Sequence, residues 1–152
     1  MTAKTVEERV NADTVELIKE CDAGVKTAVK SIDEVLDTVV DNEMEKMLVE
    51  NKKDHEKIQN EIDKLLDKYN KEGKEPSPMA KAMSWTKINI KIMTDKSDKT
   101  VADLITEGCN MGIKTLNKYK NRYGKADKEA VSIADKLIQL EEQLAFKLRR
   151  FL

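Results

Sequence analysis

The sequence predicts an all-α fold, an antiparallel four-helix bundle with a short crossover helix between the second and third long helices. Of its 152 residues, 38% are charged and 39% hydrophobic, yet only 5 are Gly and 2 are Pro. So few breakers favour long helices over many short strands and turns. Apolar residues also recur at alternating steps of three and four along four long segments, which is the helical period. The length fits one domain, so we expect a single domain over 1–152, with 1–12 as an N-terminal extension and 72–98 as the crossover.

The first two predicted helices span about 11–40 and 43–71 and are joined by a break at Asp41-Asn42. Asp13 or Thr14 can cap the first helix, since short oxygen-bearing side chains accept hydrogen bonds from first-turn amides. Because the joint is short, the two helices should be antiparallel neighbours. The inward stripe predicted for the first is Val15, Ile18, Asp22, Val25, Val29, Ile32, Leu36 and Val39. The stripe predicted for the second is Met44, Leu48, Asn51, His55, Ile58, Ile62, Leu65 and Tyr69.

A glycine and both prolines in 72–78 mark the clearest break in the chain. After it we expect a short helix over 79–94, with Trp85 closing the end of the bundle. The third long helix is predicted over about 99–122, ended by Gly124 in a left-handed conformation, and the fourth over about 127–151. The third helix should turn inward Val101, Leu104, Ile105, Gly108, Met111, Thr115, Tyr119 and Tyr123. The fourth should turn inward Ala130, Ala134, Leu137, Glu141, Leu144, Leu148 and Phe151.

Each predicted stripe carries one ionisable side chain near its middle. Asp22 and His55 lie 19 and 14 residues from the first turn, and Glu107 and Glu141 each lie 17 residues from the second. At a rise of about 1.5 Å per residue, the four should fall within about one and a half turns of each other. We therefore expect four ionisable groups close together in the middle of the bundle.

Two interpretations of these four groups remain open. Isolated buried charges are costly, so such groups pair, bind an ion or change protonation. One interpretation is a metal site for iron or another divalent cation, built by Asp22, His55, Glu107 and Glu141. The other is a buried hydrogen-bond network that fixes helix register, or polar groups at the edge of the stripe. Cys21 and Cys109 lie near the same level, as soft ligands or as small buried hydrophobes.

Other chemistry is not indicated. The sequence has no glycine-rich phosphate loop, Cys-x-x-Cys pair or nucleophile elbow, so we predict no catalytic and no cofactor-binding residues. The 28 Lys and Arg nearly balance the 29 Asp and Glu, which does not favour nucleic acid as a partner. No apolar run approaches the roughly 18 residues of a membrane span. With a charged N-terminus and no disulfide pattern, a cytoplasmic protein with free thiols is expected.

The chain resembles the ferritin-like superfamily over about 14–152, and in particular small bacterial ferritin-like proteins of unknown function. The resemblance is carried by Met79-Ala80-Lys81-Ala82-Met83-Ser84-Trp85 with Lys87-Ile88, and by Ile105-Thr106-Glu107-Gly108-Cys109 in the third helix. Ferritin-like di-iron proteins use a Glu on each of two helices and Glu-x-x-His on the other two.

The resemblance implies an incomplete di-iron ligand set. Asp22 stands at the first Glu as a shorter carboxylate, and His55, Glu107 and Glu141 match three further ligands. Lys52 and Leu144 occupy the two remaining positions. The leading hypothesis is therefore a non-enzymatic bundle with a role in binding or assembly. The alternatives are a metal-binding protein used in metal buffering or as an oxidase, and an interaction module that holds a partner chain or a membrane surface. A helix face is also available for homo-oligomer formation.

Overall fold

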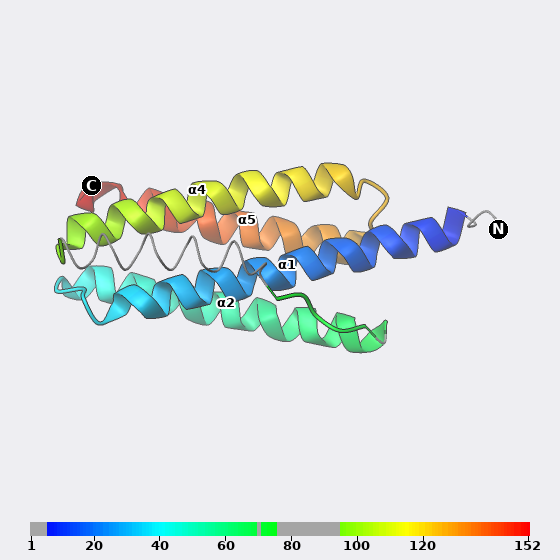
Figure 1. The fold of residues 1–152 in the computed structure, drawn as a ribbon, viewed down its shortest axis with the longest axis horizontal. Helices are drawn as coiled ribbons and strands as arrows, with labels where there is room; N and C mark the ends of the chain where they lie inside the picture. The colour runs from blue at the N-terminus through cyan, green and yellow to red at the C-terminus, as the bar shows by residue number, and fades with distance from the viewer. Residues whose placement is uncertain (1–5, 70, 76–94) are drawn as a thin grey trace.

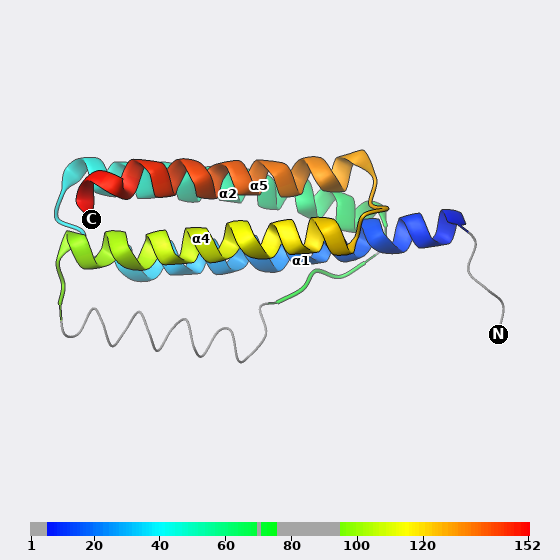
Figure 2. The same cartoon turned by 90° about the horizontal axis from the view of Figure 1, so that it is seen from above.

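The computed structural model describes the backbone of residues 6–69, 71–75 and 95–152, and the side chains from residue 12 onward within those ranges. This part of the chain is all-helical, without strands, as predicted. Its four long helices lie side by side (Figures 1 and 2). The predicted helix over 79–94 and its Trp85 lie outside the described residues. The elements are α1 (Val6–Leu36), α2 (Asn42–Lys68), α4 (Asp98–Arg122), α5 (Lys128–Leu148) and a short 3-10 turn, η1 (Arg149–Phe151).

The helices form two hairpins, α1 with α2 and α4 with α5, and the two helices of each hairpin run in opposite directions (Figure 1). Each helix of one hairpin also packs on the other hairpin, because α1 contacts α4 and α2 contacts α5. In both views α2 and α4 run in the same direction, so the end of α2 and the start of α4 lie at opposite ends of the molecule (Figure 2). The first turns of α1 extend past the other helices at the end of the molecule where α2 finishes. None of the described helices combines the length and the apolar character that crossing a bilayer requires.

Side-chain caps set the helix starts. Asp41 accepts a hydrogen bond from the Met44 amide at 2.9 Å and so begins α2, as the predicted break there required. Ser97 and Asp127 cap α4 and α5 in the same way. The predicted end of α4 differs, because Tyr123 is the capping residue and Gly124 does not adopt a left-handed conformation.

Polar side chains also tie the ends of the two hairpins together. Asp98, in the first turn of α4, accepts the amides of Val40 and Asp41, both at 2.9 Å. At the opposite end of the bundle, the Thr14 hydroxyl accepts the amide of Asp127 at 2.8 Å. Thr14 was predicted as a possible cap of the first helix. It lies inside α1 instead, because that helix begins at Val6, and its oxygen serves the turn before α5.

The predicted inward stripes are confirmed over most of α1, α2 and α5, but on α4 the buried part of the stripe ends at Ile105. All of the α2 stripe from Met44 to Ile62 is buried, and so are six of the seven α5 residues, from Ala130 to Leu148. On α4, the predicted Gly108, Met111 and Thr115 are exposed. Cys109 and Leu116 are buried in their place. The alternation of three and four is therefore shifted by one residue after Ile105.

Candidate functional site

Two separate apolar clusters fill the bundle, and a polar layer lies between them. Asn51 and His55 of α2 and Glu141 of α5 form this layer, and all three are buried. One cluster includes Leu17, Ile18, Cys21, Val25, Ile58, Ile62, Leu66, Leu116, Ala130, Ile133, Ala134, Leu137 and Ile138. The other includes Ile32, Val35, Met44, Leu48, Val101, Ala102, Leu104, Ile105, Cys109, Leu144 and Leu148.

The centre of the polar layer is a hydrogen-bonded pair of His55 and Glu141. His55 is only 1% exposed, and its Nε2 lies 2.9 Å from Oε1 of Glu141. Its Nδ1 lies 2.9 Å from the backbone oxygen of Asn51. That carbonyl can only accept, so Nδ1 carries a proton. The contact at Nε2 then requires one further proton, carried either by the imidazolium or by the carboxyl group. The layer is therefore built to retain a proton.

The electrostatics of this pair favour the charged imidazole. Burial by itself lowers the pKa of His55. The hydrogen bond to Glu141 and the negative charge of that carboxylate act in the opposite direction and outweigh burial, so the pKa lies above its ordinary value of 6.5. The second acceptor, the Asn51 carbonyl, adds to the rise. The direction of this shift favours the protonated imidazole, hydrogen-bonded to the Glu141 side chain.

Two small residues of α4, Gly112 and Cys109, lie beside the Glu141 carboxylate. A Cβ atom added to Gly112 would lie 3.5 Å from Oε2 of Glu141, which is ordinary van der Waals contact distance. The Cys109 side chain packs beside the same group. Burial raises the pKa of the Cys109 thiol, and the charge of Glu141 and a hydrogen bond to it raise it further. The thiol is therefore kept protonated, as a weak donor to the carboxylate and not as a nucleophile.

Asp22 of α1 belongs to a second polar group, which meets α2 at Gln59, about one helical turn after His55. Its carboxylate is 1% exposed and accepts from Nε2 of Gln59 at 2.6 Å and from Nζ of Lys26 at 2.7 Å. The backbone amide of Lys74 is a third donor, at 2.9 Å. Since Gln59 follows His55 by four residues, the two side chains leave α2 about 6 Å apart along the helix axis. Asp22 is buried as predicted, but its charge is satisfied locally.

The Asp22 group also holds down the segment that follows α2. Lys74 pairs with the buried carboxylate of Glu20, and Glu75 pairs with Lys26 at 2.8 Å. Gly73 lies so close to α1 that a Cβ added there would be 2.3 Å from Oδ2 of Asp22. Residues 73–75 are therefore held against the middle of α1, a contact that we call the clasp. A larger residue at position 73 would displace the Asp22 side chain.

The four ionisable groups that were predicted to lie close together do not all meet in the structure. His55 and Glu141 meet, Asp22 lies in the neighbouring group, and Glu107 is exposed on α4. Glu107 turns outward because the buried face of α4 follows Cys109 and Leu116, which are offset from it. Among the described residues no three His, Cys, Asp or Glu side chains are arranged to hold a metal ion. Metal binding by these residues stays a prediction.

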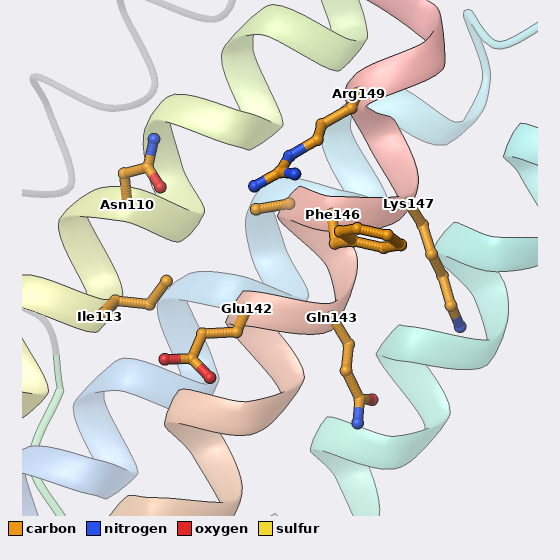
Figure 3. A pocket seen from close by; sticks show the side chains of 8 residues that line it. Asn110, Ile113, Glu142, Gln143, Phe146, Lys147 and Arg149 are labelled. Carbon is orange, nitrogen blue, oxygen red and sulfur yellow. The ribbon is translucent and has the colours of Figure 1, made fainter.

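A shallow groove with a volume of about 470 Å³ runs between α4 and α5 on the outside of the bundle. Figure 3 shows Asn110 and Ile113 projecting from α4, Glu142 from α5, and Arg149 from η1, which follows α5 directly. Phe146 lies at the same groove with 66% of its surface exposed. Phe146 was not predicted as a functional residue. A large aromatic residue at an outward position of α5, four residues after Glu142 and three before Arg149, was the available signal.

Comparison with known proteins adds no family assignment. No family model, curated protein or solved structure matches the chain.

Proposed function

We propose that this chain is a non-enzymatic, ferritin-like antiparallel four-helix bundle, with a crossover helix between α2 and α4, that functions in binding or assembly in the cytoplasm. In this proposal the polar layer has a structural role and the outer surface of α4 and α5 makes the functional contacts. The single observation that carries the proposal is the exposure of Phe146, 66% of whose surface is open to solvent beside the α4–α5 groove. Aromatic residues, phenylalanine among them, are enriched at protein–protein interfaces relative to the rest of the surface.

The two departures from the di-iron ligand pattern support a role without metal chemistry. Lys52 replaces a carboxylate and pairs with Asp33 at 2.5 Å, away from the polar layer. Leu144, which replaces a histidine, is 3% exposed and packs in an apolar cluster. His55 already uses Nε2, a metal-ligating atom of imidazole, in its bond to Glu141. Each position is occupied by a side chain suited to packing or pairing.

Site-specific photocrosslinking tests the proposed contact surface. A photoreactive phenylalanine analogue at position 146 would keep an aromatic side chain there, and the same analogue at the exposed Asn60 of α2 is the matched control. Irradiation of the native cells should give discrete adducts from position 146 and none from position 60. The proposal fails if position 146 gives no discrete adduct, or only those that position 60 also gives.

Elemental analysis tests the absence of a metal function. Protein purified without chelators, and then incubated with iron(II) or zinc and desalted, should hold far less than one metal ion per chain. A stoichiometric metal that is lost in the His55→Ala variant, with that variant still folded, would overturn this part of the proposal in favour of metal binding by the core.

A further inference from the structure

One face of α5 and of its C-cap residue, which begins η1, carries an acidic, an aromatic and a basic side chain in a symmetric order. Glu142, Phe146 and Arg149 are spaced by four and three residues, so they share one side of the helix. All three are exposed and line the α4–α5 groove (Figure 3). The Arg149 guanidinium lies 5.1 Å from the centre of the Phe146 ring. In the described part of the chain neither charge has an ion-pair partner, so both are available for contacts with another molecule.

The order of these residues is self-complementary. A second copy of this helix can lie antiparallel to the first, with a two-fold axis passing between positions 145 and 146. A residue a given number of positions before this axis then faces the residue of the second copy that lies equally far after it. Glu142 then faces Arg149 of the second copy, and Arg149 faces Glu142 of the second copy. Phe146 faces Ala145 of the second copy, which is small and lines the same groove. Reversal of the helix therefore turns each charge toward its opposite.

We propose that this face, Glu142, Ala145, Phe146 and Arg149, pairs with the same face of a second copy in an antiparallel, two-fold symmetric dimer. The inference rests on the proposed function and names the partner as a second copy of this chain. Two-fold contacts use the same patch on both subunits, and that patch must complement itself in charge and shape. The groove of about 470 Å³ offers space beside Ile113 for Phe146 of the second copy. The aromatic side chain is the anchor of the contact, and two symmetric ion pairs set its direction.

Charge reversal gives a sharp test of this arrangement. Sedimentation equilibrium over about a hundredfold range of concentration should show a reversible monomer–dimer equilibrium for the wild-type chain. Glu142→Arg alone and Arg149→Glu alone should each weaken the dimer about tenfold, since each creates two like-charge contacts. The double variant Glu142→Arg/Arg149→Glu restores opposite charges and should return the dissociation constant to within about threefold of wild type.

Two further variants test the anchor. Phe146→Glu should weaken the dimer by about thirtyfold or more, as expected of a central aromatic contact. Met111→Glu is the matched control, because Met111 is 71% exposed on α4 and does not line the groove, and it should leave the dimer unchanged. Far-UV circular dichroism checks that every variant is folded.

The outcomes separate this inference from the proposed function. A wild-type chain that stays monomeric at every concentration overturns the dimer, and so does a double charge reversal that fails to restore association. If position 146 then crosslinks to a different protein, the contact surface stands and only its assignment to a second copy is wrong. A crosslinked adduct of twice the chain mass, lost in the single charge reversals and regained in the double, supports the dimer.

Discussion

Replacing His55 by Ala tests the buried pair most directly. The change removes the bond to Glu141 and leaves that carboxylate, 8% exposed, without its partner. A hydrogen bond to a charged group contributes about 1.5–3 kcal/mol. The loss of the ring adds a cavity term, so we expect the free energy of unfolding to fall by about 3–5 kcal/mol, as for other broken buried pairs. Against a total of about 5–15 kcal/mol for an ordinary domain, such a loss is easily measured.

A double-mutant cycle separates the pair from its surroundings. Glu141→Leu should cost about as much as His55→Ala, because it leaves a buried imidazole without its carboxylate. The variant His55→Leu/Glu141→Leu leaves no unpaired charge and should be within about 1–2 kcal/mol of wild type, or more stable. Urea denaturation at pH 7, followed by far-UV circular dichroism, gives the three free energies. Two single substitutions that each cost under about 1 kcal/mol and simply add would refute the ion pair.

Three further predictions concern protonation, the clasp and the thiols. The pKa of His55 is raised on folding, so the stability that its protonation contributes is complete below the unfolded pKa of 6.5 and is lost as pH rises through the folded pKa. Urea denaturation across this pH range should show that loss in the wild-type protein. Glu141→Gln, whose side-chain amide can still donate to Nε2, should show little or none. Gly73→Ala should lower the free energy of unfolding by about 1–3 kcal/mol, because it displaces Asp22 from its donors. Gly24→Ala, where the added Cβ meets open space, should raise it by about 0.5–1 kcal/mol. Thermal unfolding compares the two variants, and equal effects would contradict the clasp. Cys109, 2% exposed and with a raised pKa, should react with a thiol reagent only on unfolding, and fast labelling of the native protein would show that the polar layer is open.

Most helix positions and most of the core could be predicted from the sequence because both follow from local rules. The exception is α1, predicted over about 11–40, which begins at Val6 and ends at Leu36. Breaks at Asp41 and before Asp98 are capping signals that act over a few residues. The stripes of α2 and α5 are long and keep their polar member in phase, so His55 and Glu141 were placed in the middle of the core correctly. A polar residue inside an apolar stripe is informative because burial of such a group demands a partner.

The face of α4 and the grouping of the polar residues could not be predicted in the same way. After Ile105 the choice between a step of three and a step of four depends on which small residue, Gly108 or Cys109, meets the neighbouring helix. Methionine at position 111 favoured the wrong step. The structure takes the step of four, which buries Cys109 and places Gly112 beside the Glu141 carboxylate of α5, so the choice depends on contacts between helices. The donors to Asp22 could not be anticipated either, since one is a backbone amide from the segment after α2.

The bonds at the two ends of the bundle have a consequence for the order of events in folding. Asp98 accepts from residues 57 and 58 positions earlier in the chain, and Thr14 from a residue 113 positions later. Each hairpin can form from contacts close in sequence, and these bonds can form only once the two hairpins have docked. If docking completes after the rate-limiting barrier, their loss should accelerate unfolding and leave the folding rate almost unchanged. The carboxylate of Asp98 and the hydroxyl of Thr14 would then govern the lifetime of the native state more than the speed of its formation.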